Sequence, residues 1–121
     1  MVQNDSQQWS VEFYADAMGR IKVLEFLNGL PAQERSAIKR SIELLLEFGI
    51  HLPAPYVRAI VGHRKLWELR AGSIRLLYFA HTGRRFVILH AFRKKGQKTP
   101  QREIAVAERR KVEFLERVGD E

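Results

Sequence analysis

The chain has no cysteine among its 121 residues. This absence excludes disulfide bonds, thiolate nucleophiles and cysteine-based zinc sites. No apolar run approaches about 20 residues, the length that a membrane-spanning helix requires. Residues 1–10 also lack the basic start and the apolar stretch of a secretory signal. These absences lead us to expect a cytoplasmic protein that does not contact a membrane.

Several common catalytic signatures are missing as well. The sequence contains neither of the glycine-rich motifs that cradle nucleotide phosphates, and no nucleophile elbow. Its four histidines lack the helical spacing of a metal motif, and no acidic cluster that could hold two Mg²⁺ ions is visible. We therefore expect no cofactor and no metal.

Positive charge is concentrated on one segment. Residues 63–102 carry eleven Lys and Arg but only one carboxylate, Glu68, whereas the whole chain has a net charge of +7. Residues 1–60 hold six basic and seven acidic residues, so the excess is local. Clustered like charges repel one another, which makes a mere solubilising surface the weaker interpretation. The pattern favours a phosphate backbone or an acidic protein as the partner.

The hydrophobic pattern predicts a strand, two helices, three strands and a final helix. Alternation near residues 9–13 predicts the first strand, and helices are expected at residues 21–27 and between Pro31 and Gly49. A proline-rich crossing follows at residues 51–55. The order indicates an α+β class with a small, mostly antiparallel sheet. We expect one domain over residues 1–121, with residues 1–8 as a flexible tail.

The basic segment carries the three expected neighbouring strands. They cover residues 65–70, 74–81 and 85–93, and their short links predict antiparallel hairpins. Arg70 and Arg75 should then lie close together at one end of a hairpin. Thr99 and Pro100 predict the start of the last helix, with the threonine hydroxyl as its N-cap.

A protein with basic side chains and no metal ion could cleave RNA, because the 2′-OH of RNA supplies the nucleophile. The protein must then stabilise charge at phosphorus and transfer protons. The candidate catalytic residues are Arg75, Arg70, Lys95, His90 and Glu68. The candidate RNA-binding residues are Lys65, Arg93, Lys94, Lys98 and Arg64.

Each candidate also has a structural interpretation. Arg75 could be paired with Glu68, or its side chain could bury its apolar stem and reach the surface with its guanidinium group. His90 could be a hydrogen-bonded core histidine, and Trp67 fits the core better than a stacking platform for bases. His63 stands beside Arg64 in an expected loop, where it could act as an acid or a base.

Four blocks carry a family resemblance: LWELR at 66–70, RLLY at 75–78, HAFRKK at 90–95, and KTP at 98–100 followed by Glu103 and Ile104. Together they resemble the RelE/ParE superfamily of type II toxins, in its HigB-like, phage-derived branch. The likeness runs from about Trp9 to Leu115. It implies a compact α+β toxin fold of the microbial RNase type. It also implies metal-independent cleavage of mRNA on translating ribosomes, and a cognate antitoxin with a helix-turn-helix domain as partner.

Carried over by position, Arg75 matches the strand arginine that contacts the scissile phosphate in RelE-type members. Lys95 falls near the basic residue that follows the last strand there. A lysine pair of those members falls here on Leu66 and Glu68, and their C-terminal tyrosine has no counterpart. Proton transfer is thus left open between Glu68, His63 and His90. The superfamily also contains toxins that act on DNA gyrase, and a non-catalytic binding module is a third alternative.

Overall fold

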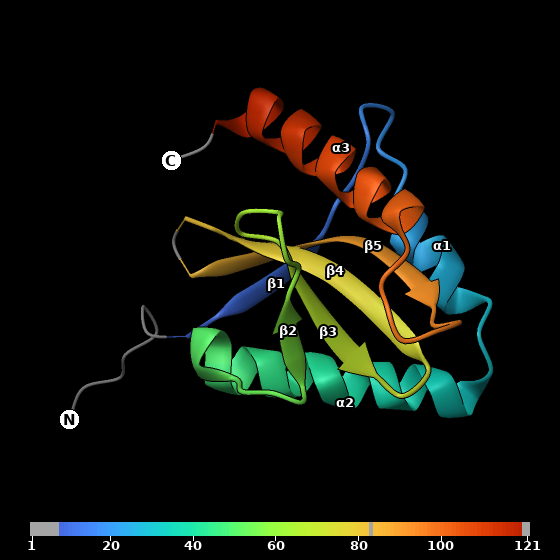
Figure 1. Cartoon of the computed structure of the whole chain (residues 1–121). Helices are drawn as coiled ribbons and strands as arrows, with labels where there is room; N and C mark the ends of the chain where they lie inside the picture. The colour runs from blue at the N-terminus through green and yellow to red at the C-terminus, as the bar shows by residue number, and fades with distance from the viewer. Residues whose placement is uncertain (1–7, 83, 120–121) are drawn as a thin grey trace.

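A five-stranded sheet forms the centre of the computed structural model, which describes residues 8–82 and 84–119 (Figure 1). The strands are β1 (Ser10–Phe13), β2 (Val57–Ala59), β3 (Trp67–Ala71), β4 (Ile74–His81) and β5 (Arg85–Arg93). Their order in the sheet is β1-β5-β4-β3-β2. Only β1 and β5 pair in parallel among these strands, and the other neighbours are antiparallel. The expected α+β class is confirmed.

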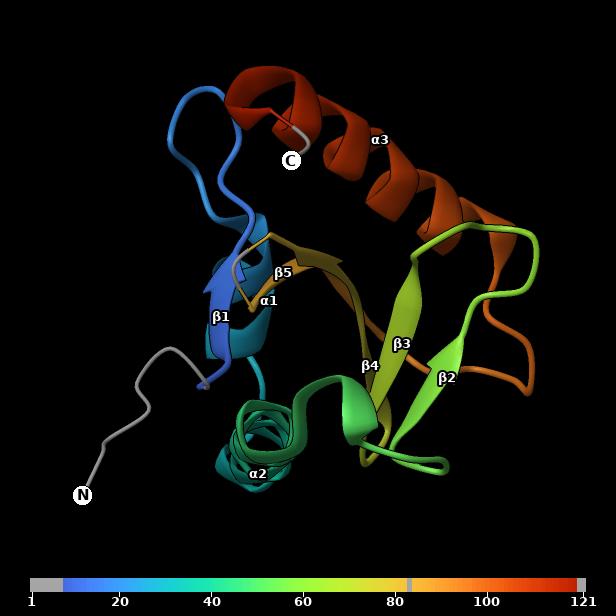
Figure 2. The same ribbon diagram turned by 90° about the vertical axis from the view of Figure 1, so that its left-hand side faces the viewer.

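Helices cover both faces of the sheet. The helices α1 (Lys22–Asn28) and α2 (Ala32–Phe48) pack on one face, and α3 (Gln101–Val118) crosses the other (Figure 2). Two separate apolar clusters result. One contains Leu27, Ile38 and Leu45 from the first two helices, and the other contains Ile104 and Phe114 from α3. Side chains alternate along a strand, so the central strands β4 and β5 supply both clusters.

The end of α2 depends on a tight approach between two elements. Gly49 follows the helix with φ +58° and ψ −133°, a conformation in which residues with a side chain are strained. A Cβ atom at this position would lie 2.2 Å from the ring of Trp9. Trp9 in turn stacks on Phe86 of β5, with ring centroids 4.8 Å apart. The missing side chain thus lets the start of the chain pack against the end of α2.

The edge strand β2 was not expected from the sequence. It spans only Val57–Ala59 and follows the proline-rich crossing, so its alternation is too short to stand out. The next strand begins at Trp67 instead of Lys65, because Lys65 has φ +61° and cannot continue an extended strand. Trp67, expected in the core, is 39% exposed.

The start of α3 also differs from expectation. Pro100, not Thr99, occupies the N-cap position, and no side chain caps the helix. The hydroxyl group of Thr99 donates a hydrogen bond to Glu68 of β3 instead. No helix in the described ranges is long and apolar enough to cross a membrane. The expected tail falls outside the described residues, apart from Gln8.

Candidate functional site: a basic pocket

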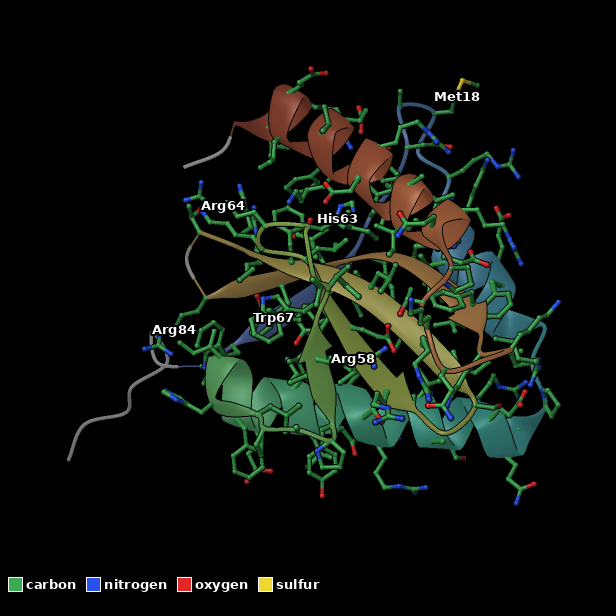
Figure 3. The ribbon with its side chains drawn as sticks, viewed as in Figure 1. Met18, Arg58, His63, Arg64, Trp67 and Arg84 are labelled. Atoms are coloured by element: carbon green, nitrogen blue, oxygen red, sulfur yellow. The ribbon has the colours of Figure 1, made fainter. Side chains whose placement is uncertain are left out.

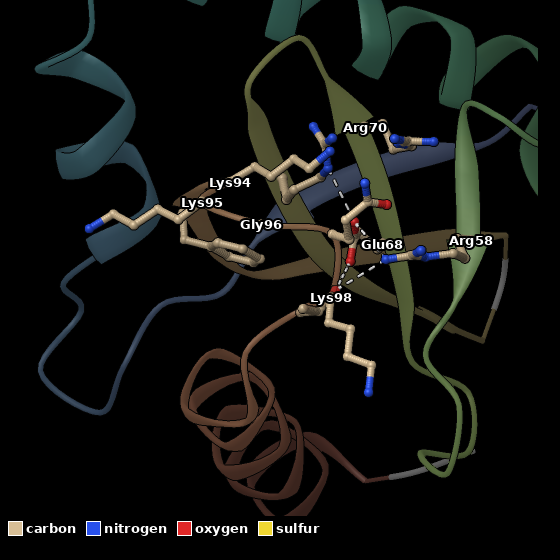
Figure 4. Close-up of a pocket in the computed structure, with 11 residues that line it drawn as sticks. Arg58, Glu68, Arg70, Lys94, Lys95, Gly96 and Lys98 are labelled. Atoms are coloured by element: carbon tan, nitrogen blue, oxygen red, sulfur yellow. Dashed lines mark hydrogen bonds and ion pairs between the residues drawn. The ribbon is translucent and has the colours of Figure 1, made fainter.

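A pocket opens on the α3 side of the sheet, where the loop after β5 folds back towards β3 and β4 (Figure 4). We call it the basic pocket. Its lining residues are Arg58, Glu68, Arg70, Arg75, Phe92, Lys94, Lys95, Gly96, Gln97, Lys98 and Thr99. Six of these side chains are cationic, and Glu68 is the one carboxylate among them. The pocket therefore has a strongly positive field.

The register of the sheet brings the arginines together. Arg70 on β3 lies opposite Arg75 on β4, which confirms that the two stand close at one end of the hairpin. Arg58 on β2 lies opposite Glu68 on β3 in the same way. Directly paired residues of antiparallel strands share one face of the sheet. All four side chains therefore reach the same pocket.

Glu68 is the buried centre of this arrangement. The residue is 2% exposed, and its Oε2 lies 3.2 Å from Nε of Arg75 and 3.6 Å from Nη2 of Arg58. Its other oxygen, Oε1, accepts the hydrogen bond from Thr99. A buried carboxylate is tolerated when it is paired and hydrogen-bonded, as here. The pairing of Arg75 with Glu68, one of the sequence interpretations, is confirmed.

Arg75 is held rigidly. It is 5% exposed, and its Nη1 donates hydrogen bonds to the carbonyl oxygens of Gly72 at 2.7 Å and Ile74 at 3.1 Å. Burial lowers the pKa of the guanidinium, the positive charge of Arg70 lowers it further, and Glu68 acts in the opposite direction. Its Nη2 makes no hydrogen bond to any described residue. The guanidinium is thus fixed in place with one nitrogen left for a ligand.

Four further cations around the pocket have no acidic partner. Within the described ranges, the side chains of Arg70, Lys94, Lys95 and Lys98 form no ion pair and no hydrogen bond. The backbone N–H of Lys94 donates a hydrogen bond to the carbonyl oxygen of Ser73 at 2.8 Å. This bond ties residues 94–100, which we call the basic loop, to the β3–β4 turn. Lys95 points away from Glu68 (Figure 4). Unpaired cations on an anchored loop can bind phosphate oxygens.

His90 lies outside this pocket. It pairs with Leu77 in the register of β4 and β5, so Leu77 stands between His90 and Glu68 in the row across the sheet. Its Nε2 is 2.6 Å from Oε1 of Glu103 on α3. Burial lowers the pKa of His90, against the opposing effect of the hydrogen bond to Glu103. This geometry is that of a hydrogen-bonded histidine under a helix.

The remaining candidates are scattered. Arg93 extends to the other face of the sheet, where it forms a two-pronged pair with Glu34 of α2. His63, Arg64 and Lys65 belong to the loop between β2 and β3, and none of them lines the basic pocket. His63 Nδ1 lies 2.9 Å from Glu108 of α3, and Arg64 stands at the same end of the molecule (Figure 3).

Two residues of the pocket that contact Glu68 were not among the site residues predicted from the sequence. Arg58 lies before the basic segment, between the proline-rich crossing at residues 51–55 and the first of the three expected neighbouring strands. Thr99 was assigned to helix capping, yet its hydroxyl binds Glu68. No signal in the sequence pointed to Arg58, because the three residues of β2 are too few to show a period. Among the described residues, no group of three or more His, Asp or Glu is placed to hold a metal ion.

The position of His90 leads to a prediction on stability. Its pKa is lowered in the fold, so the unfolded chain binds the proton more readily as the pH falls below about 6.5. The free energy of unfolding should therefore decrease between pH 7 and pH 5. Urea titrations at several pH values measure this slope, and His90→Gln should flatten it. His51→Gln, at an exposed position, should leave it unchanged. An unchanged pH dependence of the free energy of unfolding in His90→Gln would contradict the prediction that His90 causes this dependence.

A known protein family matches most of the chain. Residues 25–112, more than two thirds of the chain, match the family described as phage derived protein Gp49-like (DUF891). The matched range includes β2 to β5 and the whole basic loop. No curated protein matches the chain. The chain therefore belongs to the Gp49-like phage-derived family, a family of toxin-like proteins.

Proposed function

We propose that the protein is the toxin of a type II toxin–antitoxin system, in the HigB-like branch of the RelE/ParE superfamily, and that it cleaves mRNA on translating ribosomes. The observation that carries the proposal is the basic pocket itself. Among the described residues, a rigid, buried Arg75 stands beside four unpaired cations, and Glu68 is the one carboxylate that lines the pocket. The membership in a toxin-like family supports the same conclusion.

The chemistry follows from the charges. The 2′-OH of the RNA loses its proton and its oxygen attacks the adjacent phosphorus. The bond from phosphorus to the 5′-oxygen of the next nucleotide breaks, that oxygen takes up a proton, and a 2′,3′-cyclic phosphate remains. Negative charge then grows on the phosphate oxygens, where Arg75 and Arg70 can donate hydrogen bonds. Donors that are fixed before the reaction need no reorganisation during it. The bonds from Arg75 to Gly72 and Ile74 give that rigidity.

A direct test separates this function from its alternatives. Purified protein is added to translating ribosomes, and primer extension maps any new 5′ ends on the mRNA. A gyrase supercoiling assay runs in parallel. Cleavage with unchanged supercoiling is the expected result. Loss of supercoiling without RNA cleavage would identify a gyrase-directed toxin, and no effect in either assay would leave a non-catalytic module.

The partner that best fits the pocket is an antitoxin with acidic residues. Opposite charges steer association, and covering the cations would exclude RNA. We infer that the antitoxin carries a helix-turn-helix domain and is encoded beside the toxin. Expression of the neighbouring open reading frame should protect Arg70 and Lys94 from chemical modification. An antitoxin that neutralises the toxin but leaves both residues reactive would contradict masking of the pocket.

Binding to RNA should depend strongly on salt. Neutralising about four phosphates releases counterions, so the affinity should fall well over tenfold between 50 and 200 mM salt. Fluorescence anisotropy with a labelled single-stranded RNA measures the slope. Lys94→Gln should make the slope shallower by about 0.7. Lys39→Gln, on α2 at the opposite face, should not change it. A flat salt dependence of the unmodified protein would argue against a phosphate-binding pocket.

A further inference from the structure

Arg58 stands on the edge strand β2 and faces the buried carboxylate of Glu68 (Figure 4). Its side chain is 51% exposed, whereas that of Glu68 is 3% exposed. Nη2 of Arg58 lies 3.6 Å from Glu68 Oε2 and 3.5 Å from the hydroxyl oxygen of Thr99. One end of the guanidinium therefore meets the protein, and the rest is open to the pocket.

Glu68 does not need Arg58 to balance its charge. Arg75 forms the closer ion pair at 3.2 Å, and Thr99 satisfies the second carboxylate oxygen. Arg58 instead adds to the positive field at Arg75. After burial and the charge of Arg70, Arg58 is a further cause of the lowered pKa of Arg75. In the free protein, Arg58 and Arg75 thus share one carboxylate oxygen of Glu68, and a bound anion would supply the negative charge that the two arginines lack.

We propose that Arg58 is a second phosphate-binding arginine of the basic pocket, and that Glu68 is the residue that positions Arg58 and Arg75 around one phosphate. The inference rests on the proposed function and deepens it. The two arginines reach the Oε2 atom of Glu68 from the strands on either side of β3, namely β2 and β4. Both planar guanidiniums can then turn hydrogen-bond donors towards the same anion.

This arrangement also decides the role of Glu68. Its two oxygens are occupied by Arg75, Arg58 and Thr99, and the side chain is buried. A general base must reach the proton that it removes. Glu68 acts through the arginines, so it is a positioning residue. Thr99 extends the same network to the start of α3.

Binding measurements on Arg58→Ala test the first half of the proposal. The probe is an RNA oligonucleotide with 2′-O-methyl groups, which cannot be cleaved, and its affinity is followed by fluorescence anisotropy. The affinity should fall about tenfold and the salt slope should become shallower by about 0.7. Arg58→Lys should recover part of the loss, because an ammonium keeps the charge but not the planar fork. Lys39→Ala is the matched control on the opposite face.

Thermal unfolding separates binding from a structural role. In phosphate-free buffer, Arg58→Ala should unfold close to the temperature of the unmodified protein, because the half-exposed Arg58 contributes little to stability while Arg75 still pairs with the carboxylate of Glu68. Inorganic phosphate should raise the unfolding temperature of the unmodified protein more than that of the variant. A variant that is less stable but binds the oligonucleotide normally would show a structural salt bridge and overturn the proposal. Equal affinity and equal response to phosphate would overturn it as well.

Kinetics of Glu68→Gln test the second half. The amide keeps the size of the side chain but loses the charge that holds the arginines. The cleavage rate should fall while the acidic limb of the pH–rate profile remains. Disappearance of that limb would make Glu68 the base and overturn its positioning role. A protein that binds the oligonucleotide through Arg58 yet never cleaves RNA would refute the endoribonuclease function alone. An unmodified protein that binds neither RNA nor phosphate would refute both.

Discussion

Replacing Arg75 by alanine should slow RNA cleavage by about 30- to 1000-fold, which corresponds to roughly 2–4 kcal/mol of lost transition-state stabilisation. Arg75 is the most rigid cation of the basic pocket, because Gly72, Ile74 and Glu68 all hold it. Single-turnover rates on a synthetic RNA measure the loss. Arg75→Lys should restore only part of the rate, since lysine cannot present two parallel donors.

The same substitution also removes the closest partner of a buried carboxylate. Breaking a buried pair costs about 3–5 kcal/mol when nothing replaces it. Arg58 remains beside Glu68 and should reduce that cost. The rate must therefore be compared at a temperature where circular dichroism shows both proteins folded. An Arg75→Ala variant that is folded and fully active would remove Arg75 from the catalytic machinery.

A second large effect is expected far from the pocket. Gly49→Ala should destabilise the fold by roughly 2–6 kcal/mol, since it combines backbone strain with overpacking. The backbone at Gly49 has φ +58°, and the new Cβ would lie 2.2 Å from the Trp9 ring. Domains of this size are stable by only about 5–15 kcal/mol. Chemical denaturation monitored by tryptophan fluorescence measures the change.

Gly62 provides the matched control for this experiment. It also has a positive φ, +83°, but a Cβ there would meet nothing within 4 Å. Gly62→Ala should therefore show the conformational cost alone, about 1–2 kcal/mol. Equal losses in the two variants would mean that Trp9 moves aside without cost. The difference between them measures how tightly Trp9 closes the end of α2.

Much of the fold follows from local patterns in the sequence. The apolar face of α2 and the alternation in β4 and β5 identify these elements, because each is long enough to show its period. The strand β2 has three residues and cannot show a period. Its existence depends on pairing with β3, which is a tertiary interaction. The parallel pairing of β1 with β5 is equally invisible to local analysis.

The sequence predicted those contacts of the basic pocket that form between residues close to each other along the chain. Arg70 and Arg75 are joined by a tight turn, so their proximity could be inferred. Arg58 and Thr99 reach Glu68 from distant parts of the chain, and no local rule brings them there. Positive charge alone did not show which residues line the basic pocket. Arg93 is as basic as Lys94, yet alternation turns it to the opposite face, where Glu34 neutralises it.

The parallel pairing of β1 with β5 has a consequence for synthesis of the protein. Ser10 to Phe13 can join the sheet only after Arg85 to Ile88 have been made, and Glu68 lacks the Thr99 hydroxyl until the basic loop has followed. Contacts so distant in sequence form late. A nascent chain on its ribosome therefore carries no finished pocket. We expect the chain to be harmless to the ribosome that makes it until most of its length has emerged.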